Sequence, residues 1–116
     1  TLLANINATR AQRGHHALQL DPALSDIARA AAQSYFANAD ATEQGAIEQA
    51  NQQLARFSVL YERVNAVIAV TRTLEPIATL EPPLDPKARN IGIGVAQGDR
   101  GQGRTLAVML VVAYPR

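Results

Sequence analysis

Cysteine and tryptophan are both absent from this chain of 116 residues. The lack of cysteine excludes disulfides, thiol catalysis and metal sites built on thiolates, but it leaves the cellular compartment open, because exported domains can also lack cysteine. Aromatic residues make up only 4% of the sequence, against 47% for hydrophobic residues in total. The core is therefore expected to consist mainly of alanine, leucine and valine side chains.

An excess of either charge is also missing. Eleven basic and ten acidic residues give a net charge of +1, and the arginines and the single lysine, Lys87, are scattered along the chain. This dispersed balance argues against nucleic acid or an anionic membrane as the partner. There is no apolar run of 18 residues and no signal-like segment, so we expect no membrane span. Because the chain begins at Thr1 rather than Met, we expect an upstream segment to have been removed.

The length fits one domain that covers residues 1–116, because a chain of this size can bury about two-thirds of its unfolded surface in a single core. The first half predicts three helices. Apolar residues at helical spacing predict a first helix that ends at Gly14. Asp21 is a favourable N-cap for a second helix, and Asp40 begins an approximate capping box with Glu43 for a third.

The second half of the chain contains more β-branched residues and predicts strands over residues 59–70, 91–96 and 105–114. Residues 73–80 predict one or two helical turns, and the glycine-rich stretch 98–103 predicts a turn or loop. This order of elements is typical of the α+β class. We expect three N-terminal helices packed on a small antiparallel sheet that ends in a C-terminal hairpin.

Few residues are suited to catalysis or metal binding. His15 and His16 are the only histidines, and two adjacent loop residues rarely converge on one metal ion, so we expect them to be solvated or packed in their loop. No serine lies in a G-x-S-x-G elbow. Gly92 and Gly94 alternate along a predicted strand without a helix after them, which indicates close approach of a neighbouring layer rather than a phosphate-binding loop.

Two blocks of the sequence resemble the CAP superfamily, the SCP-like extracellular domains related to cysteine-rich secretory and plant pathogenesis-related proteins. The first block follows the family pattern L-x-x-I-N-x-x-R-x-x-x-G-x-x-x-L-x-x-D-x-x-L-x-x-x-A, which here includes Asn7, Arg10 and Asp21. The second reads D-P-x-x-R-N-I-G-I-G-V over residues 85–95. The resemblance implies a divergent, shortened bacterial member with a layered αβα fold, secreted or periplasmic.

In this family a cavity is lined by two histidines and two acidic residues, and the resemblance implies that this chain has lost part of that set. Asn38 stands where a motif like Y-F-x-H places one histidine. Glu62 or Asn65 is the nearest equivalent of the first acidic residue, which belongs to a G-E-N-I motif. The segment that carries the second histidine is missing before residue 85. We therefore expect a degenerate cavity, with Asn38, Glu62 and Asn65 as its candidate residues, and neither a metal nor a cofactor.

These observations predict a non-enzymatic binding or interaction module. Its expected partner is another protein, a small apolar ligand or a second copy of the chain, and Arg100 and Arg104 are candidates for a partner-binding loop. We also expect the strand over residues 59–70 to be exposed along one side, because the shortened segment after it removes a cover from the sheet. The alternative is a hydrolase that uses Glu62 and a histidine, or a lipid-binding member of the family with a non-standard site.

Overall fold

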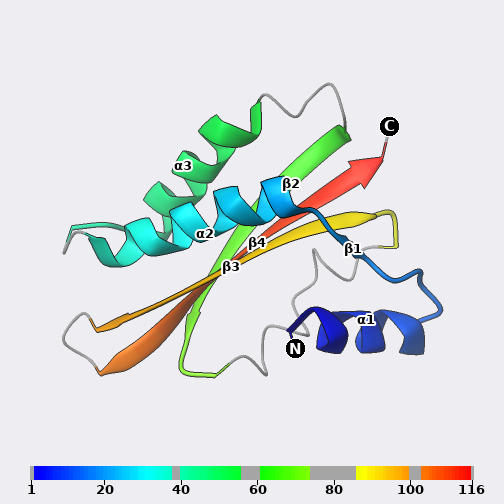
Figure 1. Ribbon diagram of the computed structural model, residues 1–116, viewed down its shortest axis with the longest axis horizontal. Helices are drawn as coiled ribbons and strands as arrows, with labels where there is room; N and C mark the ends of the chain where they lie inside the picture. The colour runs from blue at the N-terminus through cyan, green and yellow to red at the C-terminus, as the bar shows by residue number, and fades with distance from the viewer. Residues whose placement is uncertain (1, 38–39, 56–60, 74–85, 100–102, 116) are drawn as a thin grey trace.

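The computed structural model describes residues 2–37, 40–55, 61–73, 86–99 and 103–115 (Figure 1). Three helices and four strands follow one another within these residues. In chain order they are α1 (Leu2–Gln12), β1 (Gln19–Leu20), α2 (Pro22–Ala37), α3 (Glu43–Leu54), β2 (Tyr61–Thr71), β3 (Asn90–Asp99) and β4 (Arg104–Pro115). The helical turns predicted over residues 73–80 fall, apart from residue 73, outside the described part of the chain.

The four strands form one mixed sheet in the order β1-β3-β4-β2. β4 pairs antiparallel with both β2 and β3, so the predicted antiparallel sheet with its C-terminal hairpin is confirmed. β1 adds a short parallel strand beside β3, through the pairs Gln19↔Asn90 and Leu20↔Ile91. The sequence did not indicate β1, because its two residues are exposed and too few to show a periodic pattern.

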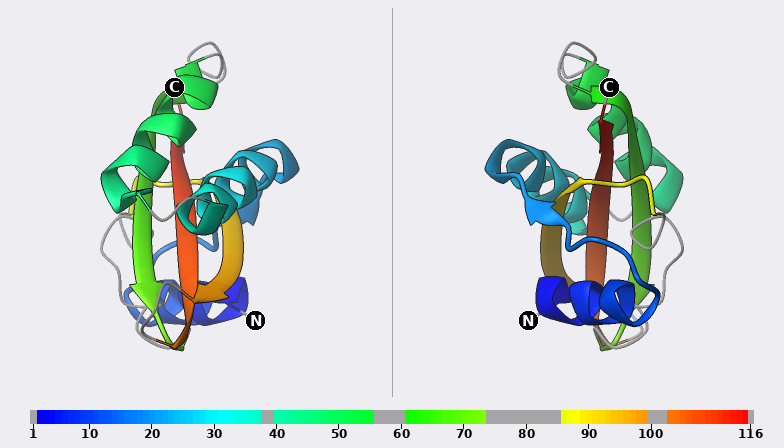
Figure 2. Two further views of the ribbon diagram at one scale, coloured as in Figure 1. Left: turned by 90° about the vertical axis from the view of Figure 1, so that its left-hand side faces the viewer. Right: turned by 90° about the vertical axis from the view of Figure 1, so that its right-hand side faces the viewer.

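The helices cover both faces of the sheet: α2 and α3 lie on one face and α1 lies on the other (Figures 1 and 2). β4 contributes side chains to both layers. Met109 and Val111 pack with α2 and α3, whereas Leu110 and Val112 pack with α1. Burial on both faces explains why β4 is a nearly continuous apolar run in the sequence. The fold is thus the α+β layered sandwich that the sequence predicts.

Capping residues set the helix boundaries. Gly14 follows α1 with a φ of 77°, the left-handed conformation expected of a glycine that ends a helix. Oδ1 of Asp21 accepts hydrogen bonds from two N–H groups in the first turn of α2, at 2.9 and 3.3 Å, which confirms Asp21 as the N-cap. The predicted capping box from Asp40 is wrong. The N-cap of α3 is Thr42, whose hydroxyl accepts a hydrogen bond from the N–H of Gly45 at 2.9 Å.

Glycines allow α2 to lie directly against β3. A Cβ atom on Gly92 would overlap the backbone of Leu24, and one on Gly94 would overlap the backbone at Ala28. Both glycines are buried, so the predicted close approach of a second layer is confirmed. Side chains at these two positions would push α2 away from the sheet.

The strands β3 and β4 extend further toward their connection than predicted. β3 continues to Asp99 and β4 begins at Arg104. Gly98 was predicted to be a turn residue, but it belongs to β3, and a Cβ atom there would overlap the ring of Phe36 on α2. A glycine is needed here because the ring of Phe36 packs against it. The sequence did not indicate this, because Gly98 is followed directly by a glycine-rich loop and was grouped with it.

Candidate functional site

A buried arginine on α1 connects two segments that are far apart in the sequence. The side chain of Arg10 is fully buried. Its Nε donates a hydrogen bond to the backbone oxygen of His16 at 2.6 Å, and its Nη2 donates to the backbone oxygen of Ala88 at 3.3 Å. Hydrogen bonds from a charged donor are stronger than those between neutral groups. Arg10 therefore fixes the loop after α1 against the segment that leads into β3.

Asn7 holds the same loop at a second point. Its Nδ2 donates to the backbone oxygen of Leu18 at 3.2 Å, and its Oδ1 accepts from the N–H of Leu18 at 2.7 Å. Asn7 and Arg10 are three residues apart, so they lie on the same side of the helix. The N-x-x-R motif of the sequence thus has a structural role, which is to shape the loop between α1 and β1.

The two segments held by Arg10 line a cleft of about 920 Å³. The start of β2 and the end of β4 complete it. Its volume lies within the range of about 300–1,000 Å³ that is typical of ligand sites. The described residues that line it are His16, Ala17 and Gln19 from the first loop, Glu62 and Arg63 from β2, Pro86, Lys87, Ala88 and Arg89 before β3, and Tyr114 and Pro115 from β4.

Basic side chains outnumber acidic ones among the described residues that line this cleft. Arg63, Lys87 and Arg89 are basic, and Glu62 is the one acidic residue among the described residues that line the cleft. All four are exposed. The guanidinium carbon of Arg63 lies 4.2 Å from the centre of the Tyr114 ring, a cation–π contact that restricts where the guanidinium can lie.

Backbone hydrogen bonds fix the position of Arg89 on two sides. Its N–H donates to the oxygen of Ala113 on β4 at 3.0 Å, and its carbonyl accepts from the N–H of Gln19 on β1 at 3.0 Å. Arg89 comes directly before β3, and its side chain is exposed. Arg89 therefore extends from a rigid base into the cleft.

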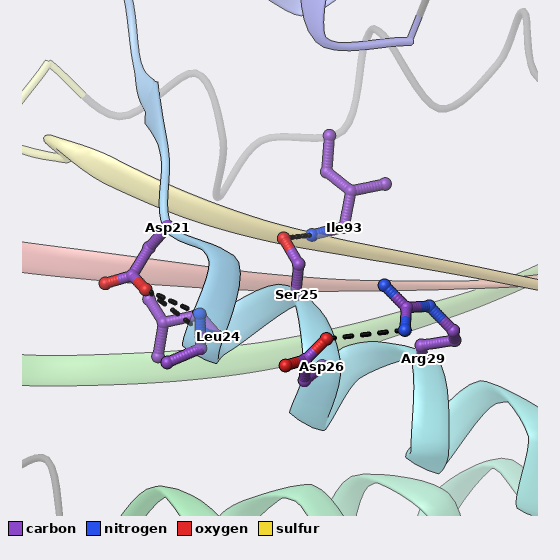
Figure 3. A network of polar contacts seen from close by, with 7 residues as sticks. Asp21, Leu24, Ser25, Asp26, Arg29 and Ile93 are labelled. Atoms are coloured by element: carbon purple, nitrogen blue, oxygen red, sulfur yellow. Dashed lines mark hydrogen bonds and ion pairs between the residues drawn. The ribbon is translucent and has the colours of Figure 1, made fainter.

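A second polar cluster anchors the start of α2, where Figure 3 shows Asp21, Ser25 and Ile93. Oδ2 of Asp21 accepts a hydrogen bond from the hydroxyl of Tyr61 at 2.7 Å, and Oγ of Ser25 accepts from the N–H of Ile93 at 3.1 Å. Burial, the hydrogen bond to Asp21 and the negative charge of Asp21 raise the pKa of Tyr61 to about 12. These groups are engaged with one another or with the backbone, so the cluster serves to hold α2 on the sheet.

The predicted cavity residues have separate locations. Glu62 lines the cleft, at the irregular start of β2. Asn65 pairs with Val112, which packs with α1, so Asn65 lies on the face of the sheet opposite to α2. Two further candidates, Asn38 and Arg100, lie outside the described residues.

Arg104 and the histidines are placed by the structure. Arg104 is exposed at the start of β4, and the opposite end of that strand lines the cleft, so the arginine lies far from it. His16 lines the cleft together with Glu62, whereas His15 is not among the described residues that line it. The sequence predicted a site with Glu62 and a histidine only as the alternative to the binding module.

Sequence reasoning missed the basic residues of the cleft. Arg63, Lys87 and Arg89 come from two segments that meet only in the folded chain, and in the sequence they belong to a scattered set of basic residues. The one available signal was Arg89, which lies in the D-P-x-x-R-N block. That motif indicated family resemblance without indicating a charged site.

The described residues restrict the chemistry of the site. No group of three or more histidine, aspartate or glutamate side chains among them is arranged to hold a metal ion. The described lining of the cleft contains no serine, threonine or cysteine that could act as a nucleophile. The described lining offers charged and hydrogen-bonding groups, among them the imidazole of His16 and the carboxylate of Glu62. In the described part of the chain, no helix has the length and apolar character needed to cross a membrane.

Comparison with known proteins gives a family and a fold. A model of the cysteine-rich secretory protein (CAP) family matches residues 3–114. A search of curated proteins gives no match. The structure is similar to a cysteine-rich secretory protein from Staphylococcus aureus, with a TM-score of 0.67 and 19% identity, over 97% of this chain and 37% of that one. It is also similar to an extracellular protein containing an SCP domain from Bacillus anthracis, with a TM-score of 0.63 and 15% identity, over 94% of this chain and 37% of that one. The chain thus spans little more than a third of either protein.

Proposed function

The chain belongs to the cysteine-rich secretory protein (CAP) family, and from that premise we propose that it is a non-enzymatic binding module, secreted or periplasmic. The observation that carries the proposal is the cleft, which is held in shape by Arg10 and lined by exposed charged side chains. A location outside the cytoplasm is supported by the family and by the extracellular protein from Bacillus anthracis with a similar fold.

We propose that the family cavity is degenerate in this chain. Asn38 takes the sequence position of a histidine, and an asparagine amide is neither a base nor a good ligand for Zn²⁺. Glu62 belongs to the charged cleft, while Asn65 lies on the α1 face of the sheet. The recognition surface is therefore the cleft rather than the cavity that the resemblance implies.

A protein partner fits this cleft better than an apolar ligand does. An apolar molecule would remove the guanidinium groups of Arg63 and Arg89 from water without offering them hydrogen bonds, and burying charged groups in this way is costly. A protein segment supplies polar groups that replace the lost water. The hairpin residue Arg104 lies at the other end of β4 and is proposed to be a second, separate contact.

One observation favours a second candidate function. His16 and Glu62 line the same cleft, and an imidazole and a carboxylate can act as a general acid and base. A hydrolase that activates water between these two residues is therefore the alternative. It differs from the binding module in requiring turnover.

Hydrolysis and metal titration distinguish the two candidates. We expect no cleavage of casein or of p-nitrophenyl esters above the rate of a Glu62→Gln variant, and no stoichiometric Zn²⁺ binding that survives His15→Ala and His16→Ala. Glu43→Gln, which alters an exposed carboxylate on α3, is the matched control. A rate that is lost in Glu62→Gln and His16→Ala, but retained in Glu43→Gln, would establish the hydrolase and exclude the binding module.

Binding itself is tested by two-dimensional ¹⁵N–¹H spectra recorded with a mixed peptide library and, separately, with palmitate. We expect the peptides to shift the amide signals of residues 16–19, 62–63, 87–89 and 114. Shifts caused by palmitate alone would contradict the choice of a protein partner. If no peptide shifts these signals at millimolar concentration, the binding module is wrong.

A further inference from the structure

We infer that the cleft binds an acidic peptide segment of a partner protein, with Arg63 and Arg89 as the residues that bind its carboxylates. This inference rests on the proposed function, since it names the chemistry of the ligand that the binding module recognises. It is carried by three features of the cleft: its charge, the anchoring of the Arg63 side chain and of the Arg89 backbone, and its size.

The charge of the cleft departs from that of the whole chain. The chain is nearly neutral, with a net charge of +1, yet the described lining of the cleft has three basic residues and one acidic residue. A concave surface on which charges of one sign predominate concentrates their electrostatic potential and attracts ligands of the opposite sign. The predicted ligand is therefore anionic.

Each arginine is held at one point before a ligand arrives, Arg63 by its side chain and Arg89 by its backbone. The guanidinium of Arg63 lies over the Tyr114 ring, and the backbone of Arg89 is hydrogen-bonded to β4 through Ala113 and to β1 through Gln19. Groups that are already in place lose less conformational entropy on binding. The planar guanidinium also matches a carboxylate through two parallel hydrogen bonds. Two such groups, on β2 and just before β3, are suited to two carboxylates of one ligand.

The size and the other walls of the cleft favour a peptide over a small anion. A volume of about 920 Å³ is far greater than a single inorganic anion needs. Ala17, Pro86 and Pro115 provide apolar surface among the charged residues, which suits the backbone and methylene groups of a peptide. Glu62 repels any carboxylate placed next to it, so we expect acidic residues that are spaced rather than consecutive to bind best.

The inference is tested by titration of the ¹⁵N-labelled chain at low salt with an acetylated and amidated (Glu-Gly)₄ peptide. The uncharged (Gln-Gly)₄ peptide and inorganic phosphate are titrated in parallel. We expect the acidic peptide to shift the cleft signals with an affinity at least tenfold above that of either comparison probe. Arg63→Gln and Arg89→Gln should each weaken this binding about fivefold or more, Arg89→Lys should restore part of it, and Glu62→Gln should strengthen it.

Arg29→Gln is the matched control, because it removes the same charge from an exposed residue of α2 that is not among the described residues lining the cleft. An equal loss of binding in Arg29→Gln would show attraction by overall charge, and would overturn the inference. Tighter binding of phosphate than of the peptide would also overturn it. Equal binding of both peptides at the cleft would refute the acidic ligand while leaving the binding module intact, whereas turnover dependent on Glu62 would refute the module itself. Spectra that keep the native signal dispersion confirm that each variant folds.

Discussion

At the scale of single residues, Arg10 is a charged side chain whose complete burial is energetically costly. A fully buried guanidinium loses the hydration of its charge, and it is retained because backbone oxygens such as those of His16 and Ala88 accept its hydrogen bonds. Among the described residues, no buried side-chain nitrogen or oxygen atom is left without a hydrogen bond. The stability of the cleft thus depends on one side chain that takes no direct part in recognition.

Arg10→Ala is expected to lower the free energy of unfolding by about 3 kcal/mol or more. The substitution leaves the backbone oxygens of His16 and Ala88 without this donor, and hydrogen bonds to charged groups contribute about 1.5–3 kcal/mol each. Urea denaturation measures the change. Arg29→Ala is the control, because Arg29 is exposed and its ion pair with Asp26 is expected to contribute less than about 0.5 kcal/mol. A similarly small loss of unfolding free energy in both variants would show that Arg10 does not hold the loop and the segment before β3 together.

Tyr61 gives the fold a dependence on alkaline pH. Its pKa is raised from 10 to about 12 in the folded chain, by burial first and then by Asp21, so the folded state retains a proton that the unfolded state releases. The contribution to stability is complete below pH 10 and is lost as the pH rises from 10 toward 12. We expect the difference in unfolding free energy between the native chain and Tyr61→Phe to shrink over this range. A difference that stays constant from pH 9 to pH 12 would contradict the shift.

At the scale of elements, the contact of α2 with β3 determines the thickness of the sandwich. Gly92, Gly94 and Gly98 are separated by even numbers of residues, so they lie on the same face of β3 and present no side chain to α2. Above them lie Leu24, Ala28 and Phe36 in turn. β1 ends opposite Ile91, so the N–H of Ile93 has no described strand partner on that side, and it donates its hydrogen bond to the hydroxyl of Ser25 instead. Small residues and one serine thus replace the aromatic core that the composition lacks.

Gly94→Val is expected to destabilise the chain by about 1–3 kcal/mol or more, because its Cβ would overlap the backbone at Ala28 and Arg29. Thermal unfolding followed by circular dichroism measures the effect. Gln97→Val is the control, because it places the same side chain at an exposed position of the same strand. An unchanged melting temperature for Gly94→Val would mean that α2 does not lie on β3 as described.

Elements with strong local signals were predictable from the sequence, and those defined by distant partners were not. The N-cap Asp21 and the apolar run of β4 depend on residues near one another in the chain, and both were predicted. β1 has only two residues and exists through its pairing with β3, about 70 residues later. The same reason concealed the cleft. Glu62 was a candidate from its motif, but Arg63 and Arg89 acquire a common role only when β2 and the start of β3 meet beside β4.

At the scale of the whole molecule, the order β1-β3-β4-β2 places β2 at an edge of the described sheet. Its residues from Val64 to Thr71 are half-buried, and β4 is the one described strand that pairs with it. The exposed side that the sequence predicted for residues 59–70 therefore remains a prediction. Among the described residues, no strand pairs with β2 on the side away from β4. Edges of this kind invite pairing with another chain.

Hydrogen exchange of the whole chain tests this prediction. We expect the amides of β4 to exchange slowest, because β4 pairs with strands on both sides. In β2, amides that face β4 should be protected, and the alternate amides should exchange faster. Strong protection of every amide over residues 61–71 in a monomeric sample, shown by analytical ultracentrifugation at high concentration, would mean that this edge is already covered.

The hydrogen bond between Arg10 and Ala88 joins residues that are 78 positions apart, and this separation affects how the cleft forms during folding. Contacts so distant in sequence are slow to form, because a long loop must close before they give any stabilisation. The β3–β4 hairpin is local, whereas the cleft requires α1, β2 and the start of β3 to be in place together. A chain in which these segments have not yet met therefore has no cleft. The proposed partner, if it recognises the cleft, would bind only completely folded molecules.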